Sequence, residues 1–349
     1  MGRGAGKKAR ILFRAGLLAV SLAVALVLSE AVIARVAPQV VRYPKFRFSR
    51  AYHHDWYPST TVEHYKPGAW RFSYDINEYG YRGPAVPLAG RYEKPNIVVL
   101  GDSFTAGFGV EGGRVFTDVL RQEMGGAYEV VNLGVGGWGL TQEIRRFYEF
   151  GIRYQPAAVV LQFCHNDPRD GEEAPVCKVA DGRFLFPDMK LDIGAFRQAL
   201  SGSILQKSQL KTLVFNALDI LRQGRKKGEA GEEEGERGAA REAGYNELLA
   251  AFARDLKRRG IPLVMISVNG DLDTFPAIRE TIASLAAEGA LAYLETGDWF
   301  AGVTDYGTPE GHAWGEKAHR IVGERLAGYL RGMGGRRPAI PPCSWQGGT

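Results

Sequence analysis

Short, continuously apolar segments alternate with longer segments of mixed polarity through the middle and C-terminal parts of the chain. Continuous apolar runs are typical of strands buried on both faces, and helically spaced apolar residues are typical of helices that cover a sheet. We expect strands at 97–100, 129–132, 157–163, 262–267 and 290–294. We expect helices at 115–124, 141–154, 245–259, 277–288 and 316–330. This alternation predicts an α/β fold with a five-stranded parallel sheet between two layers of helices.

A long apolar segment within residues 1–37 predicts a membrane-spanning helix. Basic residues precede an uncharged run from Ala15 to Ser29, and apolar residues continue past Glu30 to Ala34. About 20 helical residues cross a bilayer core. A cleaved signal peptide fits the same pattern, but no convincing small-residue cleavage site follows the run, so we favour an uncleaved anchor. The basic N-terminal flank then predicts that the rest of the chain lies outside the cytoplasm, on the periplasmic or extracellular side.

Three further segments depart from the α/β pattern. Residues 38–95 are rich in aromatic and turn residues, which predicts short strands that pack as an apron on a main domain at 96–331; exposed aromatics that hold a sugar or a lipid are the alternative. Residues 222–244 carry many charges and no apolar side chain larger than alanine, so we expect a flexible charged insertion, either a linker or a frayed helix. The tail at 332–349, rich in glycine and proline, is expected to be disordered.

Composition limits the partners and cofactors. The net charge of +5 arises from basic residues near the two ends of the 349-residue chain, so no nucleic-acid partner is expected. The three cysteines are too few for a disulfide scaffold, although Cys164 and Cys177 could form a bridge in an oxidising compartment. No Cys/His spacing resembles a zinc site, and we expect neither a metal nor a cofactor.

A serine follows directly on the first expected strand, in the sequence Gly101-Asp102-Ser103. Open α/β sheets bind ligands at the carboxyl ends of their strands. A turn into a helix there would direct both the hydroxyl and the backbone N–H of Ser103 toward the crevice, as a nucleophile requires. A helix N-cap is the ordinary alternative for such a serine.

Three other segments reach the same edge of the sheet. A glycine-rich loop at 132–139 follows the second strand, and glycines allow backbone N–H groups to approach an anion. Asn166 follows the third strand and could donate to a developing oxyanion. His312 precedes the last helix, in a loop that can bend toward the crevice. Each segment alone has an ordinary explanation as a turn or cap, but their joint occurrence favours a catalytic site.

With these four segments the chain resembles the SGNH/GDSL-type hydrolases, over roughly residues 96–330. The resemblance implies a three-layer, flavodoxin-like α/β/α fold and a set of site residues. Ser103 matches the nucleophile and the first oxyanion donor, Gly137 the second donor, Asn166 the third donor, and His312 the general base. The segment 77–83 also resembles a stretch found upstream of the nucleophile in membrane-anchored members.

The chain departs from the family pattern at two places. Cys164 stands where a glycine is usual, and the aspartate expected two or three residues before His312 is replaced by Pro309 and Glu310. The acid of the triad is therefore Glu310, the weaker candidate Asp305, or no residue at all.

The resemblance predicts a serine esterase that forms an acyl-enzyme, acting on a small-molecule ester or, given the membrane anchor, on an acylated envelope glycan or lipid. An O-acetyltransferase that passes the acyl group to a sugar hydroxyl would use the same residues. A non-catalytic binding module on the same fold is the third alternative, favoured by the missing aspartate. We expect His319 to be a surface residue of the last helix and His165 to be a turn residue.

Overall fold

The computed structural model describes residues 3–44, 46–88, 92–189, 204–227 and 232–333. Its centre is a five-stranded parallel sheet with the strand order β12-β11-β8-β6-β7. The strands are β6 Asn96–Leu100, β7 Glu129–Asn132, β8 Pro156–Phe163, β11 Leu263–Ser267 and β12 Ala292–Leu294. The predicted parallel sheet is confirmed, and each strand lies within two residues of its expected position.

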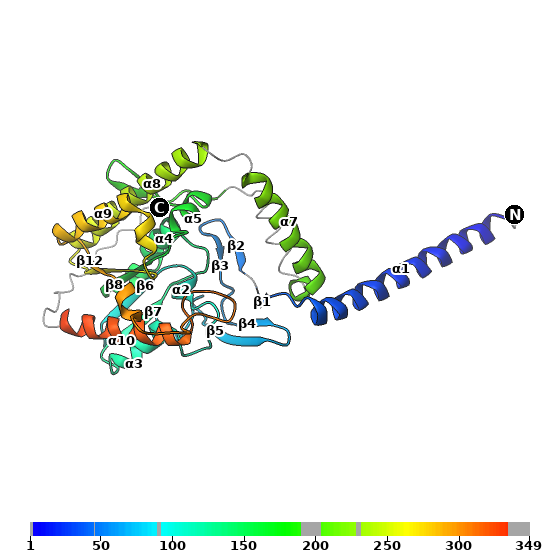
Figure 1. Cartoon of the computed structure of the whole chain (residues 1–349), viewed down its shortest axis with the longest axis horizontal. Coiled ribbons are helices and arrows are strands. Elements are labelled where there is room, and N and C mark those ends of the chain that lie inside the picture. Colours follow the sequence, from blue (N-terminus) through cyan, green and yellow to red (C-terminus); the bar gives the residue numbers. More distant parts are fainter. Residues whose placement is uncertain (1–2, 45, 89–91, 190–203, 228–231, 334–349) are drawn as a thin grey trace.

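Helices cover both faces of this sheet (Figure 1). On one face lie α4 Leu140–Glu149, α8 Glu232–Arg258 and α9 Pro276–Ala287; on the other lie α3 Phe116–Glu123 and α10 Glu316–Met333. Alternate strand residues pack into the two cores: Val98 and Leu100 of β6 face one core, and Ile97 and Val99 face the other. The expected three-layer α/β/α arrangement is therefore confirmed. Shorter helices are α2 Ser103–Ala106, α5 Asp167–Glu173, η1 Gly151–Tyr154, η2 Ile204–Lys207, η3 Asp271–Thr274 and η4 Gly297–Phe300.

The aromatic-rich segment forms two small antiparallel sheets that pack on the main domain. β1 Val41–Tyr43, β4 Thr60–Lys66 and β5 Trp70–Ile76 form one, and β2 Arg47–Ser49 pairs with β3 His53–Asp55. Four of its aromatic side chains, Phe46, Tyr52, Trp56 and Tyr74, are buried and share one apolar cluster with Ala106, Val135 and Trp138 of the main domain. These rings therefore form a core rather than an exposed binding surface. A further hairpin joins β9 Lys178–Ala180 and β10 Arg183–Leu185.

Helix α1, Arg3–Val36, projects away from the rest of the molecule (Figure 1). From Arg10 to Val36 it is long and apolar enough to cross a membrane, and it is not buried by other parts of the chain. Its C-terminal end contacts the main body of the described chain, where Glu30 meets the start of α7 Gln209–Lys227.

The charged insertion is helical where the structure describes it: 222–227 end α7 and 232–244 begin α8. The sequence suggested a linker or a frayed helix because the segment has little apolar surface to bury. Its alanines, glutamates and arginines are nevertheless strong helix formers, so a helix needs no burial there. Of the tail expected to be disordered, Gly332 and Met333 end α10, and 334–349 lie outside the described residues.

Candidate active site

Ser103 lies at the turn between β6 and α2, at the carboxyl edge of the sheet. Asp102 is the N-cap of α2, and its Oδ1 accepts the Phe104 N–H at 3.0 Å. Its Oδ2 accepts the Ser103 hydroxyl at 3.3 Å. Ser103 is half-buried, and its hydroxyl is held by the buried carboxylate of Asp102.

Gln162 of the neighbouring strand β8 holds this turn in place. Its Oε1 accepts the N–H of Asp102 at 3.2 Å, and both the N–H (3.3 Å) and the hydroxyl (3.0 Å) of Thr105. The turn also requires glycine at 101, because a Cβ there would lie 2.2 Å from Thr105 Oγ1 and 2.5 Å from Gln162 Oε1. A side chain at 101 would therefore displace the contacts that orient Ser103.

His312 brings its imidazole to this serine. Ser103 Oγ lies 3.0 Å from His312 Nε2, although the two residues are 209 positions apart. His312 belongs to the loop between η4 and α10, and a tight turn holds it there: the Thr308 hydroxyl accepts the His312 N–H at 3.0 Å. The ring packs on Phe104, with ring centroids 3.9 Å apart. The expected pairing of Ser103 with His312 is therefore present in the structure.

The pKa of His312 is lowered to about 4, mainly by burial; the backbone of Trp314 opposes this shift, and the nearby His64 adds a smaller contribution in the same direction as burial. The imidazole is therefore neutral at pH 7, as a base that accepts the serine proton must be. Its Nδ1 is buried and has no hydrogen-bond partner among the described residues.

The two expected acids lie elsewhere. Glu310 Oε2 lies 3.3 Å from Nε2 of His64, a fully buried residue of β4. Its Oε1 is buried without a hydrogen-bond partner in the part of the chain that the structure describes. Asp305 is exposed and adopts a positive φ of 56°. The structure therefore brings neither carboxylate into hydrogen-bond contact with His312.

The three expected oxyanion donors surround the same corner. The backbone N–H groups of Ser103 and Gly137 donate to no acceptor in the described parts of the chain. Gly137 has a φ of +79°, a conformation that favours glycine. The amide of Asn166 is engaged: its Nδ2 donates to Asp170 Oδ2 at 2.5 Å and to Asp102 Oδ2 at 3.4 Å. Donation to an oxyanion would therefore require Asn166 to give up one of these carboxylates.

Three buried carboxyl groups lie beneath the site. Burial raises the pKa of Asp102 to about 6 and raises those of Glu143 and Asp167 well above their usual range. Neither carboxyl oxygen of Glu143 has a partner among the described residues. Glu143 and Asp167 therefore favour their protonated forms, whereas Asp102 is mostly ionised at pH 7.

The apron supplies residues to the crevice that the sequence analysis did not select. Arg42 of β1 and His64 of β4 are paired across the sheet, and His54 Nε2 lies 2.9 Å from the Gly136 carbonyl oxygen. Arg82 is buried and donates to the carbonyls of Ala106, Gly107, Val110 and Glu111, which lie in α2 and the loop that follows it. The only sequence signal for them is the density of histidine, arginine and aromatic residues before the main domain.

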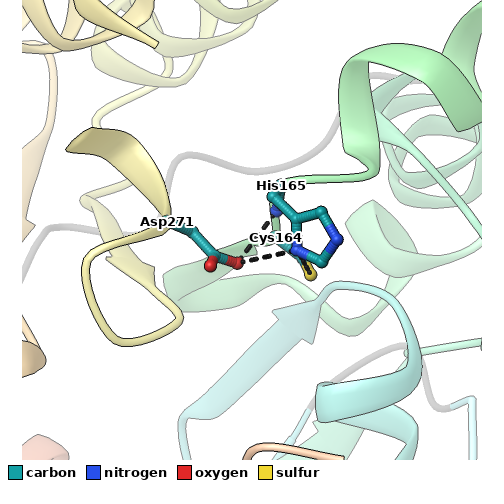
Figure 2. Close-up of side chains that lie close together, drawn as sticks. All are labelled: Cys164, His165 and Asp271. Atoms are coloured by element: carbon teal, nitrogen blue, oxygen red, sulfur yellow. Dashed lines mark hydrogen bonds and ion pairs between the residues drawn. The ribbon is translucent and has the colours of Figure 1, made fainter. Parts of the chain in front are cut away.

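Cys164, His165 and Asp271 bring three side chains of metal-ligand type together beside the site (Figure 2). Asp271 Oδ2 accepts the His165 backbone N–H at 2.9 Å and lies 3.3 Å from its Nδ1, and that nitrogen lies 3.5 Å from Cys164 Sγ. Burial raises the pKa of the Cys164 thiol, which disfavours the thiolate that binds metals. The hydrogen bond from the His165 N–H to Asp271 holds the loop that carries Asn166.

Two other residues differ from expectation. His319 is fully buried rather than on the surface: its Nδ1 accepts the Phe116 N–H at 3.2 Å and fixes the start of α3. Cys164 and Cys177 are both buried free thiols, so the bridge left open by the sequence is not formed. His165 is exposed in a turn, as expected.

Sequence comparison supplies a family for this geometry. The GDSL-like lipase/acylhydrolase family matches residues 99–314, more than half of the chain. No curated protein matches the sequence.

Solved structures with a similar fold include several esterases. The esterase EstA from Pseudoalteromonas sp. is 11% identical, with 70% of this chain and 100% of that chain covered and a TM-score of 0.43. The acetyl xylan esterase Est2A from Butyrivibrio proteoclasticus is 14% identical, with 78% and 68% covered and a TM-score of 0.37. The carbohydrate acetylesterase Est24 from Sinorhizobium meliloti is 9% identical, with 69% and 100% covered and a TM-score of 0.37. These likenesses are too remote to bear on the substrate.

Proposed function

The chain belongs to the GDSL-like lipase/acylhydrolase family, and we propose that it is a serine esterase whose catalytic pair is Ser103 and His312. The observation that carries the proposal is the 3.0 Å contact between Ser103 Oγ and His312 Nε2 at the carboxyl edge of the sheet. A nucleophile within hydrogen-bond reach of a neutral base is the arrangement that covalent catalysis requires.

In the proposed reaction Ser103 Oγ attacks the ester carbonyl carbon while His312 Nε2 accepts the hydroxyl proton. The tetrahedral intermediate collapses when His312 returns this proton to the leaving alkoxide, and an acyl-serine remains. In the second half, His312 accepts a proton from water while the water oxygen attacks the acyl carbon. The bond from this carbon to Ser103 Oγ then breaks as His312 gives the proton to Oγ, which releases the acid and restores the Ser103 hydroxyl. Proton transfers through a positioned base of this kind contribute about 10²–10⁴-fold to rate.

The oxyanion would be held by the N–H groups of Ser103 and Gly137, with the Asn166 amide as the third donor. Each such donor is worth about 2.7–4 kcal/mol of transition-state stabilisation. The first two are supported by their lack of any other acceptor in the described residues. The third is supported only by the closeness of Asn166 to Asp102.

Glu310 enters this proposal as a positioning residue. Its carboxylate contacts His64 and lies two residues before His312, so it ties the His312 loop to strand β4. The catalytic pair then functions without a carboxylate on His312 Nδ1, and burial keeps the imidazole in its neutral form.

We also propose that α1 is an uncleaved membrane anchor, with the enzyme outside the cytoplasm and acting on an acylated envelope glycan or lipid. The contact that supports retention of α1 is Glu30, whose Oε2 accepts the Gln209 N–H at 2.7 Å and whose Oε1 accepts the Ser208 hydroxyl. A carboxylate at a helix N-terminus stabilises that helix. Removal of α1 would leave α7 without this partner.

The test treats the full chain in detergent with a fluorophosphonate probe and with an aryl acetate. We expect Ser103→Ala to abolish both labelling and turnover, whereas Ser284→Ala, on the exposed face of α9, behaves as the wild type. Labelling that survives in Ser103→Ala would contradict the proposed nucleophile. A folded wild type that neither labels nor turns over would favour the binding module instead.

Adding an oligosaccharide acceptor to the same assay separates an esterase from an O-acetyltransferase. An esterase releases acetate at a rate that the acceptor does not change. Acetylated oligosaccharide formed at the expense of free acetate would identify the transferase.

A further inference from the structure

Arg42 places a positive charge beside the proposed nucleophile. It lies on β1, six residues beyond the last residue of α1, and is paired with His64 on β4. Directly paired residues of neighbouring antiparallel strands direct their side chains to the same face. His64 contacts Glu310, two residues from the proposed base, so this face of the apron sheet is the one that meets the loop of His312.

The guanidinium of Arg42 and the side chain of Ser103 both lie close to Gly136. A Cβ built on Gly136 would lie 3.7 Å from Arg42 Nη1 and 3.5 Å from Ser103 Cβ. Gly136 precedes Gly137, the proposed second oxyanion donor. The cation and the nucleophile therefore border the same small space, on the side of the crevice where the substrate carbonyl would lie.

The charge on Arg42 has no direct partner within the described residues. Its guanidinium lies 4.3 Å from the ring centroid of Phe46 and 5.5 Å from that of Phe108. It makes no hydrogen bond or ion pair there. Electrostatic interactions with Tyr74 and with Glu310 act to raise the pKa of Arg42, less strongly than burial lowers it, and the Glu310 carboxylate itself contacts His64. Burial lowers the pKa of Arg42, the effect expected where a cation has lost solvent without gaining a direct counterion.

We propose that Arg42 binds an anionic group of the substrate, a carboxylate or a phosphate carried close to the scissile ester. A planar guanidinium donates two parallel hydrogen bonds to either group, and the two flanking rings hold it in one orientation. The proposal rests on the proposed esterase function and narrows its substrate class to esters of acidic molecules, such as an acylated acidic sugar or an anionic lipid headgroup.

The test compares two pairs of similar esters, with one anionic and one neutral member in each pair. The pair 4-acetoxybenzoate and methyl 4-acetoxybenzoate carries the difference on the alcohol, and the pair 4-nitrophenyl hemisuccinate and 4-nitrophenyl butyrate carries it on the acyl group. In at least one pair we expect the wild type to have a kcat/KM about tenfold higher for the anion, equivalent to about 1.4 kcal/mol. The pair that shows the preference assigns the anion to the alcohol or to the acyl side.

Arg42→Gln should reduce this ratio to the intrinsic ratio of the two esters, and Arg42→Lys should retain part of it. The matched control is Arg71→Gln, which removes an exposed arginine from β5 of the same sheet and should retain the full ratio. The two proposals have separate readouts. Turnover of the neutral esters tests the esterase function, and the ratio of kcat/KM between anionic and neutral esters tests the role of Arg42. No preference in the wild type, or an equal loss for both members of each pair in Arg42→Gln, would overturn the proposal.

Inhibition of the wild type by benzoate and by phenyl phosphate distinguishes the two anions. The stronger inhibitor identifies the group that the site prefers, and its advantage should disappear in Arg42→Gln. Equal inhibition of wild type and Arg42→Gln by both compounds would contradict an anion site at Arg42.

A separate observation concerns α7, which carries large apolar side chains that the described chain leaves about half exposed. Val214, Phe215 and Leu218 are 46%, 46% and 44% exposed. The helix also holds Lys211, Arg222, Arg225, Lys226 and Lys227 against one acidic residue, Asp219. Basic helices with large apolar residues are typical of segments that lie in the interface of an anionic membrane.

The position of α7 agrees with its composition. Its first residue is hydrogen-bonded to Glu30, near the C-terminal end of α1. Figure 1 shows α7 crossing the direction of α1 rather than continuing it. A helix that crosses the axis of a membrane-spanning helix at its end runs along the membrane surface.

We propose that α7 lies on the anionic lipid surface next to the anchor, with Phe215 and Leu218 in the headgroup region. The test reconstitutes the full chain in vesicles of phosphatidylglycerol and phosphatidylcholine, with Cys343→Ser to remove the thiol outside the described residues. A fluorophore on Leu218→Cys should be quenched by spin-labelled lipid. One on Glu280→Cys, exposed on α9, should not.

Equal quenching at the two positions, or none at 218, would overturn this second proposal. Val214→Cys serves as the replacement if Leu218→Cys does not fold. Raising the salt concentration should weaken the quenching at 218, because it screens attraction to anionic lipid.

Discussion

Glu310 Oε2 lies 3.3 Å from Nε2 of His64, whereas His312, two residues further along, contacts the serine. The histidine that contacts the acid is therefore not the histidine that contacts the nucleophile. In a Ser-His-Asp triad one imidazole makes both contacts. Here the two contacts are divided between two histidines: His64, on strand β4 of the apron, contacts the acid, and His312 contacts the serine.

Replacing the acid should therefore cost little in the chemical step. In serine proteases the loss of the aspartate that orients the histidine reduces kcat by about 10⁴-fold. We expect the loss of kcat in Glu310→Gln to be far smaller, because the carboxylate that is removed contacts His64 and not His312. Steady-state kinetics on an aryl acetate measures this, with His312→Gln as the inactive reference. A loss in Glu310→Gln as large as that in His312→Gln would show that the carboxylate acts directly on the catalytic base.

The pH dependence of kcat/KM should have its acid limb at unusually low pH. The base must be neutral, and burial lowers the pKa of His312 to about 4, compared with about 6.5 for an exposed imidazole. Because kcat/KM reports the free enzyme, we expect half-maximal activity near pH 4 and a plateau above about pH 5. An acid limb centred near pH 6.5 would show that the imidazole is solvated in the free enzyme.

Stability should decrease as the pH rises from about 4 to 6. A carboxyl group whose pKa is raised on folding binds its proton more tightly in the folded state, so its contribution is fully present below the unfolded value and lost as the pH passes the folded one. For Asp102, with a folded pKa of about 6, this corresponds to about 3 kcal/mol.

Urea unfolding at fixed pH values measures the effect, and Glu143→Gln should reduce the slope because it removes one of the three raised groups. The amide should also increase stability at neutral pH, since it requires no proton. Stability that increases between pH 4 and 6 would mean that these carboxyl groups find partners when ionised.

Loss of Arg82 should destabilise the apron and the active site together. Its guanidinium donates to four carbonyl oxygens at 2.7–3.1 Å, and each buried acceptor left unpaired costs about 1–3 kcal/mol. We expect Arg82→Ala to lose more than about 3 kcal/mol in the free energy of unfolding. Arg82→Lys should not restore it, because an ammonium cannot reproduce the planar fork. The exposed Arg71 serves as the control, and an equally small loss in Arg71→Ala and Arg82→Ala would contradict this assignment.

Much of the main domain follows from local sequence pattern. A strand buried on both faces must be apolar throughout, so 96–100 and 156–163 are visible in the sequence, and the turn at Ser103 follows from the first of them. The burial of His319 could also have been predicted from the sequence. His319 precedes Val322 by three residues and Leu326 by seven, so it lies on the same apolar stripe of α10. A histidine on such a stripe should be expected to face the core.

The contribution of the apron could not be predicted in the same way. Which face of a short strand meets the main domain depends on pairing and docking between distant segments, and one residue of register shift exchanges the two faces. Arg42 and His64 become neighbours only through the pairing of β1 with β4. The contact of Glu310 with His64 rather than with His312 depends on that same docking.

The apron and the main domain share a buried aromatic cluster. The unit that folds is therefore larger than residues 99–314, the segment that matches the family. A fragment cut to residues 99–314 would lack Phe46, Tyr52 and Trp56 and would expose Trp138, now fully buried, to solvent. It would also lose α10 and the first three residues of β6, so the central sheet itself would be incomplete. We therefore expect boundaries drawn from homology alone to yield an insoluble or inactive protein, although the fragment would contain Ser103, Gly137, Asn166 and His312.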